Sequence, residues 1–173
     1  MAATRTRPSR TAGEREQLLG WYDLQRGIVR MKCEGLGDDD AHRVVVPSSP
    51  LMTAAGILSH LRWAEELWFR EVLLGEPGSG RGFGPDAAGV EDAEFLVQGM
   101  PVAELLAEYD AECARSDAAM AGFSLDETGS TALHSVGAAS LRWMLLHMLE
   151  ETARHAGHLD LIREQLDGET GYF

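Results

Sequence analysis

Four long stretches of the chain repeat apolar residues at intervals of three and four, which is the period of an amphipathic helix. These stretches are residues 14–32, 49–74, 101–122 and 138–166. Polar sequence rich in glycine separates them at residues 35–48, 75–90 and 124–137. The chain holds no internal repeat and no convincing strand pattern, so it predicts an all-α four-helix bundle with long connections.

Local signals predict where three of these helices begin or end. Thr11, three residues before Glu14, matches a capping box at the start of the first helix. Ser49 before Pro50 matches an N-cap followed by proline at the first helical position. Gly168 follows the last apolar position of the fourth helix, where a C-terminal cap is expected.

Length and composition fit one globular unit. The chain has 173 residues, and 45% of them are hydrophobic. We expect residues 1–12 to form a flexible N-terminal arm and residues 13–173 to form a single helical domain. The arm has no apolar run behind it, so it does not match a secretory signal. No run of 18 apolar residues occurs, which predicts a cytoplasmic protein without a membrane span.

The charge balance excludes two classes of partner. The net charge is −13, and the sequence contains no stripe of basic residues that would neutralise phosphates. We therefore expect neither nucleic acid nor an anionic membrane surface as a partner. Cys33 and Cys113 lack a CxxC context and lie in separate helical stretches, so we expect no disulfide and no cysteine nucleophile.

The last predicted helix carries a row of polar groups on one face. At roughly 100° per residue, His147, Glu151, His155 and His158 fall within about an 80° stripe. Apolar residues such as Met148 flank this stripe, so the polar groups face the core. A buried carboxylate beside imidazoles needs a compensating partner, and a divalent metal supplies one.

A histidine on the second predicted helix offers a third ligand. His60 lies on an apolar face, and together with Glu151 and His155 it can bind one side of a divalent metal. Zinc suits this donor set best, while nickel, iron(II) and manganese are compatible with it. The alternative is a hydrogen-bonded core histidine beside an ordinary Glu–His helix pair, and spacing alone does not separate the two.

Two segments add a resemblance to a known family. GILSHLRWAEELWF (56–69) and ETARHAGHLDLIREQLDG (151–168) resemble the DinB/YfiT-like metalloenzyme superfamily. The likeness is closest to its actinobacterial branch, which includes mycothiol-dependent members, and it extends over nearly the whole chain. It implies a four-helix bundle, often a homodimer, with three protein ligands for a divalent metal.

The resemblance also assigns roles to single positions. His60 matches the histidine of the family's second helix, and His155 matches the last histidine of the pair on its final helix. Glu151 stands where many members have a histidine, which matches the His, Glu, His set of the mycothiol-dependent maleylpyruvate isomerase type. His158 is a candidate acid/base, supporting group or extra ligand, and His147 is the other candidate to complete the site.

Three functions are compatible with these residues. The first is a thiol S-transferase or isomerase, in which the metal activates mycothiol or a similar thiol for attack on a small electrophile. The second is a metal-dependent hydrolase with Glu150 or His158 as the base for a bound water. The third is a non-catalytic, stress-related metal-binding protein. We take the first, a metal-dependent transferase, as the leading hypothesis.

Overall fold

The computed structural model describes residues 6–78, 90–131 and 137–171, and its regular elements are all helical. They are α1 (Glu14–Cys33), α2 (Asp38–Ala41), α3 (Ala54–Glu65), η1 (Glu66–Leu74), η2 (Ala93–Phe95), α4 (Val102–Met120) and α5 (Leu141–Asp167). Extended pairing among the described residues is limited to one isolated bridge between Thr128 and Ser140. The all-α prediction is confirmed.

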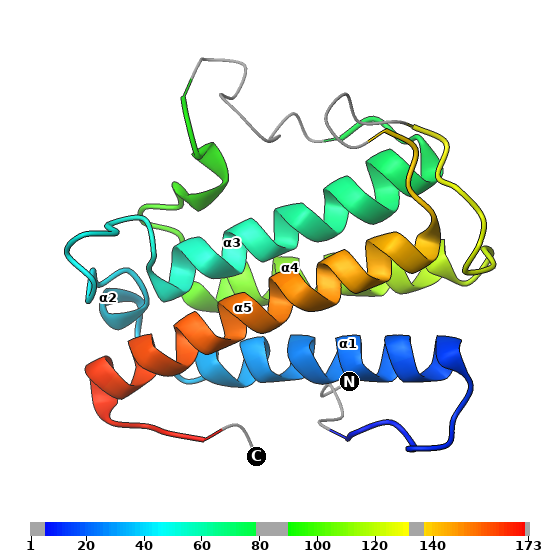
Figure 1. Cartoon of the computed structure of the whole chain (residues 1–173). Coiled ribbons are helices and arrows are strands. Elements are labelled where there is room, and N and C mark those ends of the chain that lie inside the picture. Colours follow the sequence, from blue (N-terminus) through cyan, green and yellow to red (C-terminus); the bar gives the residue numbers. More distant parts are fainter. Residues whose placement is uncertain (1–5, 79–89, 132–136, 172–173) are drawn as a thin grey trace.

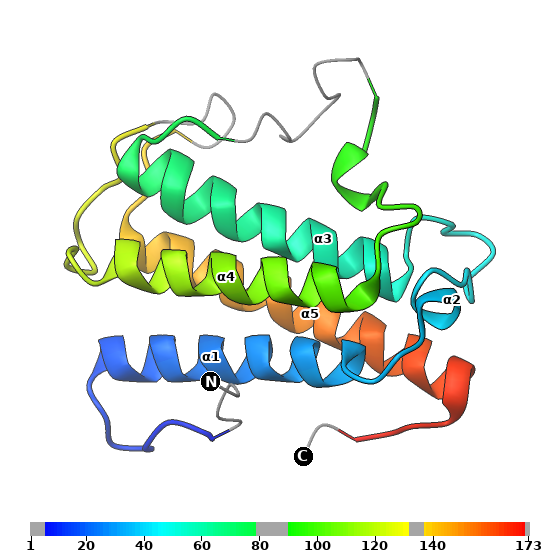
Figure 2. The same cartoon turned by 180° about the vertical axis from the view of Figure 1, so that it is seen from behind.

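The long helices pack as two parallel pairs (Figures 1 and 2). One pair is α1 with α5, and the other is α4 with the continuous rod formed by α3 and the π-helical η1. The two helices of each pair run in the same direction, and the pairs run opposite to one another. Because α3 and α4 run in the same direction, the end of η1 and the start of α4 lie at opposite ends of the bundle. A long connection is therefore needed between them.

Two groups of buried apolar side chains fill the space between these helices. One contains Ile57 of α3 and Leu159 of α5, and the other contains Trp63 of α3 and Met144 of α5. The predicted inner face of the second helix is confirmed, because His60 is buried on it together with its apolar neighbours. In the part of the chain that the structure describes, no helix combines the length and apolar character needed to cross a membrane.

Two of the predicted helix starts are wrong. Gly13 is the N-cap of α1 and no side chain caps that helix, so Thr11 does not form the predicted capping box. The second helix begins later than Ser49, because Thr53 is its N-cap and accepts a hydrogen bond from the backbone of the first turn. The predicted end of α5 is confirmed, since Gly168 is its C-cap with a left-handed φ of 78°.

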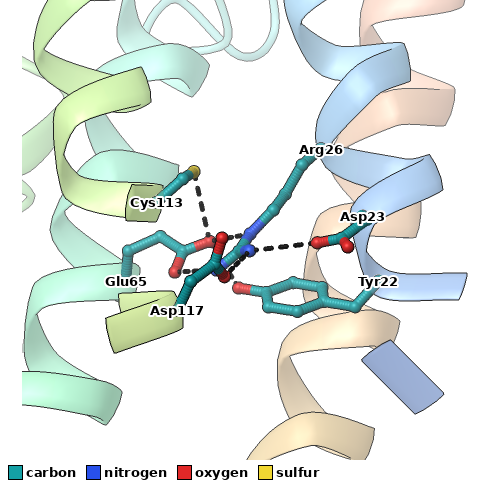
Figure 3. A network of polar contacts seen from close by, with 6 residues as sticks. All are labelled: Tyr22, Asp23, Arg26, Glu65, Cys113 and Asp117. Atoms are coloured by element: carbon teal, nitrogen blue, oxygen red, sulfur yellow. Dashed lines mark hydrogen bonds and ion pairs between the residues drawn. The ribbon is translucent and has the colours of Figure 1, made fainter. Parts of the chain in front are cut away.

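A buried ion pair joins three of the long helices (Figure 3). Arg26 of α1 donates from Nε and Nη2 to the two carboxylate oxygens of Glu65 of α3, at 2.7 and 2.6 Å. The Tyr22 hydroxyl donates to the same carboxylate, and the thiol of Cys113 on α4 lies 3.6 Å from it. Arg26 also donates to Asp117 of α4. The network fixes the relative positions of α1, α3 and α4 at the middle of the bundle.

Candidate metal centre

Three of the side chains singled out in the sequence meet between α3 and α5. The Nε2 atom of His60 lies 2.9 Å from Oε1 of Glu151, and Nε2 of His155 lies 3.3 Å from the same oxygen. One potential ligand atom from each residue lies within 4.8 Å of the other two. Within the described ranges, no other group of three or more His, Cys, Asp or Glu side chains has this spacing.

Helix geometry explains this convergence. Glu151 and His155 are separated by four residues on α5, so their side chains lie one turn apart on the same side. His60 lies in the middle of α3, which packs against α5 and brings the two imidazoles together. Their ring centroids are 4.9 Å apart. Both histidines are buried, with exposed fractions of 5% for His60 and 9% for His155, while Glu151 is half-buried.

The charge state of Glu151 favours a cation. Hydrogen bonds from His155 and then from His60 lower the pKa of the Glu151 carboxyl well below its usual value, and they outweigh burial, which acts in the opposite direction. Glu151 is therefore an anionic oxygen donor between two imidazole nitrogens.

The short turn η2 packs against His60 on a different side of the imidazole from Glu151. The ring of Phe95 stacks on the imidazole, with centroids 4.4 Å apart and planes inclined by 10°. Oε1 of the buried Glu94 lies 3.6 Å from Nδ1 of His60. The sequence alone does not predict a role for either residue. A three-residue 3-10 turn has no periodicity, and no motif in the sequence marks either side chain.

His158 lies beside the three predicted ligands. Its Nδ1 is 3.4 Å from Nδ1 of His155, and it is not a member of the group whose ligand atoms all lie within 4.8 Å. Burial, followed by the proximity of His155 and Arg154, lowers the pKa of His158. The half-buried imidazole is therefore neutral near pH 7 and able to accept a proton.

The other polar candidates of α5 lie in different surroundings. The ring of His147 stacks on Trp143, with centroids 5.2 Å apart, and meets Trp68 edge-on at 4.9 Å. Glu150 is exposed and pairs with Arg154 one turn along the helix. Neither residue belongs to the cluster around Glu151.

The residues present fit a divalent metal better than a purely hydrogen-bonded core. If His60 only donated from Nε2 to Glu151, its other nitrogen, Nδ1, would be a buried acceptor beside the Glu94 carboxylate. That Nδ1 atom has no hydrogen-bond partner among the described residues. In metal sites the outer N–H of a ligating histidine typically faces a carboxylate, and Glu94 lies in the corresponding position. Two imidazoles and one carboxylate also leave coordination positions for a substrate.

The two cysteines are free and are held as neutral thiols. Burial raises the pKa of Cys33 to about 12, and burial followed by the nearby Glu65 carboxylate raises the pKa of Cys113 well above its usual value. The prediction of no disulfide is confirmed for this pair. A thiolate nucleophile in this protein would have to come from a bound molecule.

Comparison with known proteins gives one match. The family model described as MST, mycothiol-S-transferase, matches residues 17–168, from the first turns of α1 to the cap of α5. No curated protein and no solved structure matches the chain.

Proposed function

Because the chain belongs to the mycothiol-S-transferase family, part of the DinB/YfiT-like superfamily, we propose that it is a metal-dependent enzyme that transfers mycothiol or a similar thiol to a small electrophile. The convergence of His60, Glu151 and His155 supports this proposal most directly. These three side chains would hold the cation, with zinc as the first expectation.

A divalent cation held there supplies one chemical effect, which is to lower the pKa of a coordinated thiol so that the thiolate exists at neutral pH. In the transfer reaction the thiol loses its S–H proton and the sulfur electron pair forms a bond to the electrophilic carbon. The leaving group departs with the electron pair of the bond that breaks. This chemistry requires no oxidant or reductant.

The protein's own residues have separate tasks in this proposal. Glu151 supplies the negative charge of the site, and the packing of α3 on α5 sets the distance between the two imidazoles. His158 accepts the thiol proton, because it is a half-buried imidazole next to His155 and outside the ligand group. Cys33 and Cys113 do not take part, because both thiols are held in the protonated form.

The two alternative functions have less support. A hydrolase needs a base for a water molecule, and His158 could serve it as well, whereas Glu150, the other candidate, is exposed and paired with Arg154. The family match, which names a mycothiol transferase, favours thiol transfer over hydrolysis. A structural zinc site usually has four protein ligands, whereas three converge here. The three-ligand cluster is compatible with either reaction, and the family match makes thiol transfer the function that we propose.

The test is a conjugation assay with purified, zinc-loaded protein, mycothiol and 1-chloro-2,4-dinitrobenzene. We expect thioether formation and chloride release above the uncatalysed rate, and we expect both to stop when a chelator removes the metal. His60→Ala should abolish the catalysed rate, whereas His147→Ala, which removes an imidazole of α5 outside the cluster, should retain it. Conjugation that is unaffected by the chelator and by His60→Ala would contradict the proposal. Ester hydrolysis without thiol would instead support the hydrolase.

A further inference from the structure

The turn η2 is built directly onto the part of α3 that carries His60. Figure 1 shows η2 as a short green turn beside the first half of α3, and these two elements are in contact. A Cβ atom added at Gly56 would lie 3.2 Å from the carbonyl oxygen of Phe95. The backbone of η2 therefore approaches α3 at Gly56, and one turn further along the helix the Phe95 ring stacks on His60.

This placement brings a carboxylate to the outer nitrogen of the imidazole. Nδ1 of His60 is buried without a hydrogen-bond partner among the described residues, and Oε1 of Glu94 lies 3.6 Å from it. The Glu94 side chain is 6% exposed, and the other ring nitrogen of His60 faces Glu151. The two nitrogens of one ring thus point at two different carboxylates, which come from η2 and α5.

A neutral imidazole has one N–H, and a nitrogen can ligate a metal only when it does not carry that proton. We infer that Glu94 is a positioning residue for His60: the negative charge of its carboxylate, 3.6 Å from Nδ1, favours the proton on that nitrogen and so leaves Nε2 as the metal-binding nitrogen. This inference rests on the proposed metal site. Phe95 restricts rotation of the same ring by stacking on its face. Through these two residues, η2 would contribute directly to the affinity of the site for its metal.

Zinc affinity and metal-free stability separate this role from a merely structural one. We propose to measure zinc affinity by competition with a chromophoric chelator, and urea unfolding after metal removal, in the full chain. Glu94→Gln removes the charge while retaining the size of the side chain. Glu91→Gln is the matched control, because it removes the same charge from an exposed position three residues earlier. His60→Ala tests the metal site itself.

We expect Glu94→Gln to weaken zinc binding about 10- to 100-fold, which is the usual effect of losing such an outer partner, with one zinc still bound per chain. Glu91→Gln should leave the affinity unchanged, and the metal-free urea midpoints of both variants should match that of the wild type. If Glu94→Gln lowers the metal-free midpoint and leaves zinc affinity intact, the residue only supports the fold and the inference is wrong. If His60→Ala binds zinc as tightly as the wild type, the proposed metal site fails, which is a distinguishable result.

A measurement on the unaltered protein covers the case in which Glu94→Gln does not fold. Nitrogen-15 NMR of the zinc-loaded wild type reports which nitrogen of His60 carries the proton. We expect the proton on Nδ1 and the metal on Nε2. The opposite tautomer would overturn the inference whatever the behaviour of the variants.

Discussion

The Nε2 atom of His60 lies 2.9 Å from Oε1 of Glu151, although the two residues are 91 positions apart in the sequence. The contact joins α3 to α5 and places an anionic oxygen between two imidazoles. Burial of a carboxylate in such a position is unfavourable without a partner of opposite charge or good hydrogen bonds. The contact is therefore the point at which the proposed metal dependence can be tested most directly.

The first prediction concerns metal content. We expect wild-type protein purified without chelators to contain one equivalent of divalent metal, and we expect His60→Ala and His155→Ala to lose it, because each variant leaves two of the three ligands. His147→Ala should keep its metal, since His147 stacks on Trp143 and meets Trp68 edge-on, outside the cluster. Elemental analysis of the four proteins provides the measurement. Full metal occupancy in both His60→Ala and His155→Ala would reject the ligand assignment.

The second prediction concerns stability in the presence of zinc. A ligand that binds only the folded state stabilises it, by about 2.7 kcal/mol at a free concentration of one hundred times Kd. We expect zinc to raise the thermal midpoint of the wild type and a chelator to reverse the rise. Glu151→Gln should show little or no rise, because the amide lacks the negative charge that Glu151 provides. Equal shifts in both proteins would place the stabilising zinc elsewhere on the chain.

The sequence was sufficient to predict the helical bundle and the three converging side chains. Spacings of three and four located the long helices, and the same period placed Glu151 and His155 on one face of α5 and His60 on the inner face of α3. The resemblance to the DinB/YfiT-like superfamily is confirmed by the family match. The prediction that these side chains bind a metal stays a prediction.

Other parts of the site were beyond sequence reasoning. Glu94 and Phe95 reach His60 because η2 packs against α3, and no local pattern in the sequence specifies that contact. The second helix has its N-cap at Thr53 and not at Ser49, because the backbone N–H groups of Met52 and Thr53 donate to Ser49 and Leu51 in turns that precede the helix. Arg26 is buried despite its charge. The pattern of hydrophobic and polar residues predicts charged side chains at the surface, so it does not predict this burial.

The third prediction concerns the ion pair in Figure 3. Glu65 is almost fully buried, and its carboxylate accepts two hydrogen bonds from Arg26. Glu65→Gln leaves the buried Arg26 with the more exposed carboxylates of Asp23 and Asp117 in place of a buried one, so we expect it to lower the free energy of unfolding by about 3–5 kcal/mol. Asp23, whose side chain is largely exposed, also contacts Arg26. Asp23→Asn should cost less than about 1 kcal/mol in the same urea unfolding experiment. Equal losses in the two variants would show that burial does not control the energy of this network.

The fourth prediction concerns alkaline pH. Burial raises the pKa of Cys33 from its usual 9.0 to about 12, so above pH 9 the thiol ionises in the unfolded chain but stays protonated in the folded one. The free energy of unfolding should therefore fall as the pH rises from about 9 towards 12, by up to about 1.4 kcal/mol per pH unit for one such group. The buried Tyr22 and Tyr109 hydroxyls, whose pKa values are also raised by burial, contribute in the same direction.

Urea unfolding at a series of alkaline pH values measures this slope. Cys33→Ala supplies the control, because it removes one ionising group and should flatten the slope regardless of its effect on stability at pH 7. A slope that Cys33→Ala leaves unchanged would show that this thiol does not titrate differently in the two states. The thiol should also react with iodoacetamide more slowly in the folded protein than in urea, since the thiolate is the reactive form.

The fifth prediction compares the same substitution at two helical glycines. At Gly157 of α5 an added Cβ would meet nothing within 4 Å, so Gly157→Ala should stabilise the protein by about 0.5–1 kcal/mol through the higher helix propensity of alanine. At Gly56 of α3 the added Cβ would lie 2.6 Å from the carbonyl oxygen of Leu51 and 3.2 Å from that of Phe95. Both are backbone atoms that a rotamer change cannot move. Gly56→Ala should therefore destabilise the protein by about 1–3 kcal/mol.

Gly56→Ala should also weaken zinc binding, because relief of the clash moves η2, and with it Phe95, away from His60. Urea unfolding of the metal-free proteins and chelator competition measure the two effects separately, and Gly157→Ala serves as the control for both. If alanine stabilised the protein equally at both positions, η2 would not be seated against α3 in solution. The carboxylate of Glu94 would then have no fixed position beside His60, and the metal-binding nitrogen of that ring would have to be set in another way.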